Sequence, residues 1–286
     1  ISGKFEMGKH IDKAISEEEK AQGKVLLCCT TPKSNLKINV PGFNPNALPV
    51  RTLPVRIETI EIKHDVALLR LALPKVPSFA FYAGQYIDLL LPGNISRSYS
   101  IANLPDQEGV LELHIRKREN GVCSEMIFGA EPKVKEKGIV RVKGPLGTFT
   151  LQEDSSKPII LLATGTGYAP IRSILLDLIR QNSERQVHFY WGARQQADLY
   201  ALEEAEALIG RLKNAKFSPV LSKPDSDWKG ENGYVQNVAA QNYPDLSQYE
   251  VYACGSLAMT ESAQSLLTQK CALPEDAFFC DAFSPA

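Results

Sequence analysis

Four consecutive residues, Arg97-Ser98-Tyr99-Ser100, combine one fixed positive charge, two hydroxyls and an aromatic ring. They follow a strand-like run at 84–91 and a Pro-Gly-Asn turn. Successive side chains of an extended chain point to opposite faces, so Arg97 and Tyr99 share one face and Ser98 and Ser100 the other. A guanidinium matches the oxygens of a phosphate, and a tyrosine can stack on a flat ring. The pattern indicates a site for a phosphorylated aromatic ligand; an ordinary edge strand is the alternative.

A glycine turn, Thr-Gly-Thr-Gly, lies between a continuous apolar run at 158–163 and a helical pattern at 171–180. Strand, glycine turn and helix form the context of a dinucleotide-binding loop, because glycines let the backbone approach a pyrophosphate and a helix start supplies free amides. A tight turn without a ligand is the alternative. The candidate residues are Thr164, Gly165, Thr166, Gly167 and Pro170.

Further candidates follow strands or open a helix. A Gly-Val-Cys-Ser sequence opens a short helix at 125–128, where free amides attract phosphate oxygens or Ser124 acts only as a cap. Residues just past the strand at 250–253 lie where parallel sheets bind ligands. The basic segment 114–117 either lines a ligand or ends a solvent-facing strand. The residues concerned are Gly121, Val122, Cys123, Ser124, Cys254, Gly255, Ser256, His114 and Arg116, with Gly192 and Arg194 after the strand at 186–191.

The elements that must position these residues fall into two groups. Short strands at 53–62, 66–73, 85–91, 98–102, 110–115, 139–143 and 148–151 predict a small antiparallel barrel. From residue 158 onward, strands alternate with helices at 171–180, 203–212, 235–240 and 259–268. That alternation predicts a parallel sheet with helices on both faces.

The Arg-x-Tyr-Ser stretch, the Gly-x-x-Ser and the Gly-x-Gly-x-x-Pro turn together resemble the ferredoxin-NADP reductase superfamily. The resemblance implies a Greek-key FAD-binding barrel over 46–153 and a nicotinamide-binding α/β domain over 154–286. It implies that Arg97 binds a flavin phosphate, that Tyr99 packs on the flavin ring and that Ser100 lies near flavin N5. The Gly121–Ser124 stretch would bind the pyrophosphate of FAD, and the segment 114–117, with His114 and Arg116, could line its adenylate side. Cys254 would border the nicotinamide, and the aromatic Phe283 would cover the opposite flavin face or dock on the sheet.

Residues 1–45 resemble the last third of a plant-type [2Fe–2S] ferredoxin followed by a linker. A helix is expected at 17–20 after Ser16, and a buried strand at 24–29. Cys28 matches the fourth cluster ligand, but the other three are not in this sequence, and one thiolate cannot hold two irons. We therefore expect the cluster only in a full-length parent; a buried, non-ligating Cys28 is the alternative.

Composition narrows the class of protein. A net charge of −1 over 286 residues gives no general attraction to nucleic acid or to anionic membranes. No apolar run is long enough for a membrane span and no signal peptide is evident, although the chain begins at Ile1, so a leading segment is expected to be missing. Six scattered Cys form no disulfide framework, which favours a cytoplasmic location.

The resulting hypothesis is an NADH-dependent FAD reductase that passes single electrons to an iron–sulfur centre and a partner protein. The same domain order occurs in reductases of aromatic-ring oxygenases and of deoxysugar 3-dehydration. NADPH is possible, since Lys223 could meet a 2′-phosphate, whereas Asp225 and Asp227 would repel one. The alternatives are a free flavin reductase and a non-catalytic regulatory subunit that only binds the cofactor.

Overall fold

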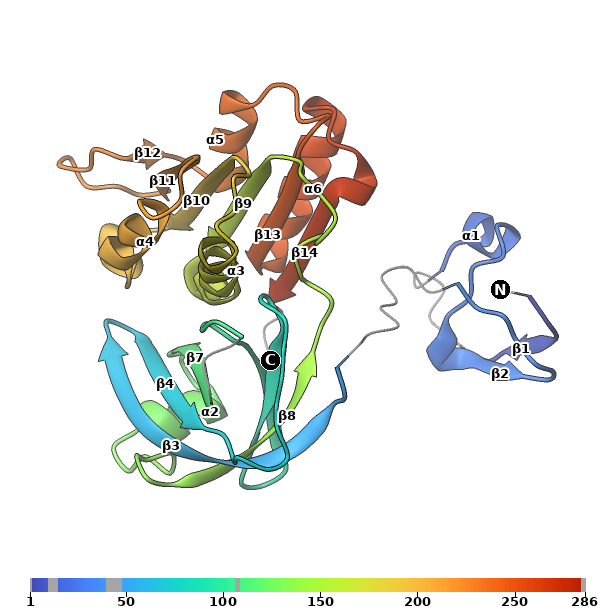
Figure 1. Cartoon of the computed structure of the whole chain (residues 1–286), viewed down its shortest axis with the longest axis horizontal. Coiled ribbons are helices and arrows are strands. Elements are labelled where there is room, and N and C mark those ends of the chain that lie inside the picture. The colour runs from blue at the N-terminus through green and yellow to red at the C-terminus, as the bar shows by residue number, and fades with distance from the viewer. Residues whose placement is uncertain (1, 10–14, 40–47, 106–108, 284–286) are drawn as a thin grey trace. The chain divides into compact units, whose positions relative to one another are not determined.

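The computed structural model describes residues 2–9, 15–39, 48–105 and 109–283 (Figure 1). The chain folds as two units, Ile1–Ala47 and Leu48–Ala286, and each is described by itself. None of the helices in the described ranges is long and apolar enough to cross a membrane.

The first unit contains β1 (Phe5–Met7), α1 (Glu17–Ala21), the 3-10 turn η2 (Leu27–Cys29) and β2 (Thr30–Pro32), with β1 and β2 antiparallel. The predicted helix is confirmed, because Ser16 and Glu19 cap its start reciprocally. The predicted strand at 24–29 is wrong. The Cys29 N–H donates to the Leu26 carbonyl at 3.0 Å and closes η2. The strand pairings among the described residues of this unit, β1 with β2 and Ser2 with Lys37, do not include residues 24–28.

The second unit begins with an antiparallel barrel built on alternating apolar residues. Its elements are β3 (Arg51–Lys63), β4 (Val66–Ala72), β5 (Tyr86–Leu91), β6 (Ile95–Ser100), β7 (Val110–Arg116), α2 (Val122–Phe128) and β8 (Ile139–Leu146). The strand order is β6-β5-β8-β3-β4-β7, and a bridge between Ile101 and Leu113 joins the two outer strands. The predicted Greek-key barrel is confirmed. The alternation on β3 explains it, since Leu53, Val55 and Ile57 all point into the core.

The predicted strand at 148–151 is wrong. Gly147, with a φ of +89°, turns the chain after β8. Phe149 then joins the core of the α/β domain and lies edge-on to Tyr252, with ring centroids 6.0 Å apart. The segment follows this tertiary contact instead of adding to the barrel sheet.

A parallel sheet forms the rest of this unit, as the alternation predicted. Its elements are β9 (Ile159–Thr164), the 3-10 turn η3 (Gly165–Gly167), α3 (Tyr168–Arg180), β10 (Val187–Ala193), the turn η4 (Gln196–Asp198), α4 (Leu202–Ile209), β11 (Ala215–Leu221), β12 (Glu231–Asn232), α5 (Val235–Asn242), β13 (Glu250–Ser256), α6 (Leu257–Lys270), η5 (Glu275–Ala277) and β14 (Phe278–Phe283). The strand order is β12-β11-β10-β9-β13-β14, so the order reverses beside β9. Ligands of such sheets bind at that reversal, at the carboxyl ends of the strands.

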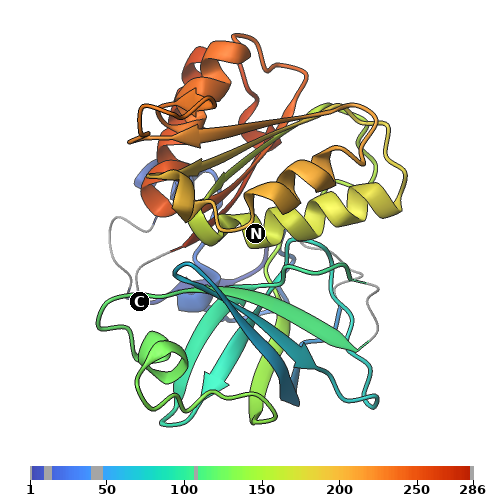
Figure 2. The same ribbon diagram turned by 90° about the vertical axis from the view of Figure 1, so that its left-hand side faces the viewer.

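Helices cover both faces of this sheet (Figures 1 and 2). One core contains Leu161, Phe189 and Trp191 with side chains of α3 and α4. The other contains Leu162 and Tyr190 with side chains of α5 and α6. The alternating strand residues therefore divide between two apolar layers, as a doubly wound sheet requires.

The barrel and the parallel sheet share part of one core. Val66, Leu68, Ala83 and Phe149 belong to the barrel segment, yet they lie in the same buried cluster as Leu161. This continuous apolar contact explains why residues 48–286 form one unit.

The turn η3 packs against β13 without room for side chains. A Cβ atom at Gly167 would overlap the Cys254 carbonyl, and one at Gly255 would overlap Thr164 Oγ1. Gly255 also has a φ of +150°, which only glycine adopts readily. Both glycines are therefore required by backbone packing, before any ligand is considered.

We predict that Gly167→Ala lowers the free energy of unfolding by about 1–3 kcal/mol, because the new methyl overpacks a rigid backbone contact. Gly210→Ala is the matched control, since Gly210 has a φ of −61° and the nearest atoms to a Cβ there are 3.5 Å away. Urea denaturation of both variants measures the difference. Equal stabilities would contradict the packing argument.

Candidate functional site

The flavin motif lies on β6, and its aromatic residue reaches the start of α2. Arg97 and Tyr99 pair with Leu89 and Ile87, which are buried in the barrel interior. The Tyr99 hydroxyl donates to Cys123 Sγ at 2.9 Å. Burial raises the pKa of Tyr99, while the positive charge of Arg97 opposes that rise. The structure thus brings together Arg97, Tyr99 and Cys123, which the sequence analysis named separately as candidate residues.

The loop before α2 adds a second cation that the sequence analysis missed. The backbone N–H of Arg118 donates to Ser124 Oγ at 2.8 Å, and the Arg118 charge also acts on Tyr99. Gly121 lies beside this contact, because a Cβ there would be 3.1 Å from Ser124 Oγ. Val122 is exposed at the helix start. Arg118, three residues before Gly121 in a basic segment, was the available signal.

The two serines of the motif lie in different surroundings, although they share a face of the strand. Ser98 is exposed and donates to Asp88 at 2.7 Å. Ser100 is 6% exposed, and its hydroxyl donates to Asp281 Oδ2 at 3.4 Å. Ser100 therefore faces the α/β domain, whereas Ser98 faces the neighbouring strand β5.

Asp281 was not predicted, because residues 278–283 were interpreted as an aromatic chain end. They form the edge strand β14 and pair with β13, which aligns Asp281 with Cys254 and Phe283 with Ser256. Cys254 is fully buried; burial raises its pKa well above the usual range, and the Asp281 charge adds to the rise. Burial also raises the pKa of Asp281. Phe283 packs partly against the core of the sheet.

The glycine turn meets β13 and β10 at the carboxyl ends of the strands. The Ser256 N–H donates to Thr164 Oγ1 at 3.3 Å. The Trp191 indole N–H donates to the Gly165 carbonyl at 3.0 Å, and Gly165 has a φ of +55°. Thr166 lies inside η3, and Pro170 is buried in the first turn of α3, where a missing N–H is tolerated.

Arg116 lies at this turn and not with Arg97. Its Nη1 atom is 3.0 Å from the position of a Cβ at Gly165. The guanidinium pairs with Asp65 at 2.7 Å and with Asp198 at 3.2 Å. These carboxylates and His64 form the one group of potential metal ligands within the described residues, and Arg116 already supplies their positive charge.

His114 lies away from the predicted flavin contacts. Its side chain is 0% exposed, and both ring nitrogens are engaged, with Tyr200 at 2.8 Å and with Glu112 at 3.0 Å. This geometry argues against the predicted contact with the adenylate side of a flavin. At the end of β10, Gly192 packs against Val235 and Arg194 is exposed.

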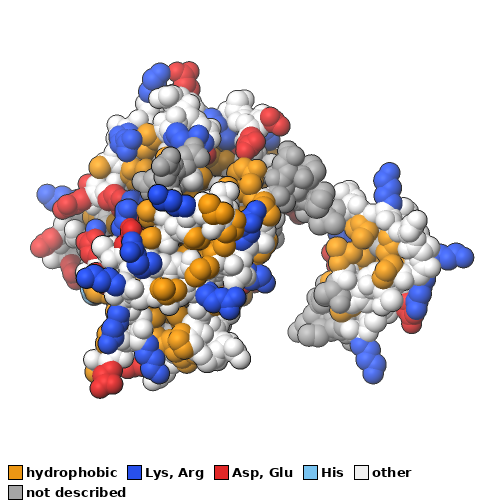
Figure 3. Space-filling view, turned by 60° about the horizontal axis from the view of Figure 1, so that its bottom comes forward, with side chains coloured by type: hydrophobic (Ala, Val, Ile, Leu, Met, Phe, Trp, Pro, Cys, Tyr) orange, Lys and Arg blue, Asp and Glu red, His pale blue; other side chains and the backbone are white. Residues whose placement is uncertain are grey.

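An open groove of about 460 Å³ lies on the outside of the barrel. It is lined by Leu90, Leu91, Pro92, Asn94, Ile95, Ser96, Ile139, Val140 and Arg141. None of the predicted cofactor residues lines this groove. Ile139, one of its lining residues, is 74% exposed. Figure 3 shows hydrophobic side chains exposed among Lys and Arg on one face of this unit.

Comparisons with known proteins agree with this architecture. Residues 55–151 match the family described as Oxidoreductase FAD-binding domain, and residues 161–265 match the Oxidoreductase NAD-binding domain. A Yersinia pestis protein named CDP-6-deoxy-L-threo-D-glycero-4-hexulose-3-dehydrase reductase is 40% identical over all of this chain and 85% of its own length. The reductase component of propane 2-monooxygenase from Gordonia sp. (strain TY-5) is 32% identical over all of this chain and 85% of its own.

A solved structure shows the same fold at lower identity. The ferredoxin reductase in carbazole 1,9a-dioxygenase aligns with a TM-score of 0.76 and 21% identity, covering 99% of this chain and 84% of its own. The chain therefore belongs to the family of FAD- and NAD-binding electron-transfer reductases, with a ferredoxin-reductase-like fold.

Proposed function

We propose that this chain takes a hydride from NADH onto bound FAD at the junction of β6, β13 and β14, and then passes single electrons to a protein acceptor. The observation that carries the proposal is the contact between Ser100 Oγ and Asp281 Oδ2 at 3.4 Å. It joins the flavin motif to the strand pair that contains Cys254.

The residues around Tyr99 fit a flavin nucleotide. A half-buried aromatic ring with Arg97 and Arg118 nearby offers a stacking surface and two cations for phosphates. We assign the flavin site to Arg97, Ser98, Tyr99, Ser100, Arg118, Gly121, Val122, Cys123 and Ser124, and leave His114 out of it. A pyrophosphate contact at Gly121–Ser124 supports FAD over FMN.

The residues at the carboxyl ends of β9, β10 and β13 fit a nicotinamide nucleotide. The positive φ of Gly165 and the nearby Arg116 suit a phosphate approached by backbone amides. Arg116, which was predicted to contact the flavin, is assigned to this site instead, and Phe283 borders it. The other residues that we assign to this site are Thr164, Gly165, Thr166, Gly167, Pro170, Gly192, Arg194, Cys254, Gly255 and Ser256.

When bound, the flavin would supply the chemistry that accepts two electrons as hydride and releases them one at a time. The chain's own residues would orient the two cofactors and exclude water from between them. The Ser100 hydroxyl lies between the two domains and donates a hydrogen bond to the Asp281 carboxylate. The buried Cys254 stays a neutral thiol, because burial raises its pKa, and it therefore places no charge beside the proposed nicotinamide site.

The acceptor we propose is a dehydrase or oxygenase component, as the names of the similar reductases suggest. We propose NADH as donor, because Asp225 and Asp227 would repel a 2′-phosphate near Lys223; the ratio of NADPH to NADH rates tests this choice. The proposed location is the cytoplasm.

Two alternative functions predict different results. A free flavin reductase would lose FAD on dialysis, and a regulatory subunit would not oxidise NADH.

We predict that Arg97→Ala weakens FAD binding roughly 10- to 150-fold, because a charge-assisted contact of about 1.5–3 kcal/mol is lost. Titration of apoprotein with FAD, followed by quenching of flavin fluorescence, measures the change. Arg141→Ala on β8 is the control and should bind FAD like the wild type. A wild type that takes up no FAD would overturn the flavin site.

NADH should bleach the FAD absorbance of the wild type when the two are mixed without oxygen. Ser100→Ala should slow that reduction about 10- to 100-fold, because a positioned hydroxyl is removed from the site. Stopped-flow absorbance measures both rates, with Ser96→Ala on the same strand as the control. Equal rates for Ser100→Ala and the wild type would contradict the assigned role.

We propose Cys28 as one of four thiolate ligands of a [2Fe–2S] cluster in a parent form that supplies three more Cys. The Cys28 side chain lies outside what the structure describes. Iron analysis and visible absorption of such a form should show two irons per chain, and Cys28→Ser should abolish both signals. A cluster that survives Cys28→Ser would overturn this assignment.

A further inference from the structure

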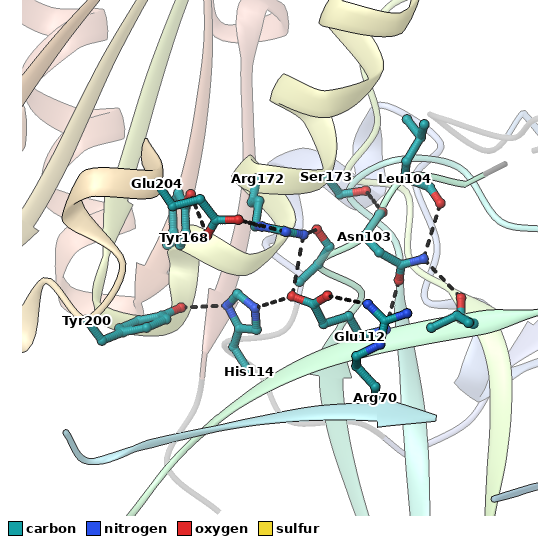
Figure 4. Close-up of polar contacts among 12 residues, drawn as sticks. Arg70, Asn103, Leu104, Glu112, His114, Tyr168, Arg172, Ser173, Tyr200 and Glu204 are labelled. Carbon is teal, nitrogen blue, oxygen red and sulfur yellow. Dashed lines mark hydrogen bonds and ion pairs between the residues drawn. The ribbon is translucent and has the colours of Figure 1, made fainter. Parts of the chain in front are cut away.

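Two adjacent residues of α3 hold two adjacent carbonyls that follow the flavin strand (Figure 4). Arg172 Nη1 donates to the Ala102 carbonyl at 2.8 Å. Ser173 Oγ donates to the Asn103 carbonyl at 2.7 Å. Ala102 and Asn103 lie just beyond Ser100, and both are 0% exposed. The α/β domain thus binds the backbone of the barrel where the flavin motif ends.

The Arg172 side chain is fixed at its other nitrogens as well. Its Nε donates to Glu204 at 2.9 Å, and its Nη2 lies 2.8 Å from the same carboxylate. Nη1, which binds the Ala102 carbonyl, also lies 3.5 Å from Glu112 of the barrel. The side chain is 14% exposed. Burial alone would lower the pKa of Arg172, but Glu112 and Glu204 raise it, so the guanidinium stays charged.

The barrel side of this contact is rigid too. Asn103 Oδ1 accepts the N–H of Glu112 at 2.8 Å, and its Nδ2 donates to the Val110 carbonyl at 2.9 Å. Glu112 accepts from His114 Nε2, which leaves Nδ1 to accept from the Tyr200 hydroxyl. A neutral His114 satisfies both bonds, and burial lowers its pKa in agreement.

The two ends of this contact lie close in sequence to the two predicted cofactor motifs. Arg172 lies in the first half of α3, the helix that starts directly after the glycine turn η3. Ala102 follows β6, which carries Arg97, Tyr99 and Ser100. Because a helix is stiff along its axis, a contact between α3 and the end of β6 also fixes the position of η3 relative to β6.

We propose that Arg172 is a positioning residue, which fixes the nicotinamide loop relative to the flavin strand for hydride transfer. This inference rests on the proposed function, because it concerns the geometry of that reaction. Transfer between two bound rings depends steeply on their separation, and a displacement of about 1 Å can cost about 100-fold in rate. Apart from Arg116 of β7, each cofactor is bound by residues of one domain, so the binding of either cofactor alone depends much less on this contact.

A merely structural arginine would behave differently, and the chain offers one for comparison. Arg185 is 11% exposed, pairs with Glu250 at 2.7 Å and donates to the Lys157 carbonyl at 2.7 Å. It therefore has a similar burial, one carboxylate and one backbone carbonyl. All of these contacts lie inside the α/β domain, so Arg185→Leu removes a buried ion pair and a bond to a carbonyl without touching the barrel.

The test compares FAD-loaded wild type, Arg172→Leu and Arg185→Leu by anaerobic stopped-flow reduction with NADH and with NADH deuterated at C4. We expect Arg172→Leu to lower the limiting rate at least about 10-fold. The apparent Kd for NADH should stay within about twofold of the wild type, because the loop's own contacts remain. The deuterium isotope effect should be as large as in the wild type or larger, which places the lost rate in the hydride step.

Three results would overturn the positioning role: a rate no lower than that of Arg185→Leu, a loss explained by a raised Kd, or an isotope effect that disappears. Should Arg172→Leu fail to fold, Arg172→Lys and Ser173→Ala decide, since each removes part of the contact. Both are expected to be slower than the wild type with unchanged Kd, and wild-type rates in both would overturn the role. A wild type reduced by dithionite but by neither NADH nor NADPH would overturn the proposed function itself.

Discussion

The site depends on a contact between two stretches of backbone. The turn η3 and the end of β13 approach so closely that neither Gly167 nor Gly255 has room for a Cβ. Such an approach brings the amides of the turn, the Cys254 thiol and the β14 residues into one small region at the end of the sheet. Larger residues would separate β9 from β13 and move the nucleotide loop with them. The carboxyl-end geometry of the parallel sheet therefore follows from two missing side chains.

The barrel is held against that region by both apolar and polar contacts. Phe149 and Leu68 enter the core of the parallel sheet, so the two domains could separate only by exposing apolar surface. Arg172 and Ser173 then fix the register of that contact, because each requires a particular carbonyl. Apolar burial supplies the cohesion, while directional hydrogen bonds define one arrangement among the many that burial alone would allow.

The sequence predicted what depends on local pattern. The spacing of short strands and turns predicted the barrel, and the continuous apolar run with its glycine turn predicted the strand, turn and helix that the structure shows as β9, η3 and α3. Prediction from the sequence failed where a contact between distant segments determines the position of a residue. Phe149 leaves the barrel for a neighbouring core, Asp281 acquires its role only because β14 pairs with β13, and His114 is buried by a domain that begins after it. No short-range signal in the chain reports such pairings between distant segments.

The hydrogen bond between Ser100 and Asp281 spans 181 residues of sequence. Domains generally fold from the N-terminus as they leave the ribosome, so the barrel can form while the sheet is still incomplete. Asp281 is carried by β14, which joins the edge of the sheet after every other described strand has been made. A nascent chain that has formed β6 but not β14 lacks Asp281 and therefore the hydrogen bond to Ser100. On the proposed function, hydride transfer would therefore require the last strand, and partly synthesised chains would not consume reductant.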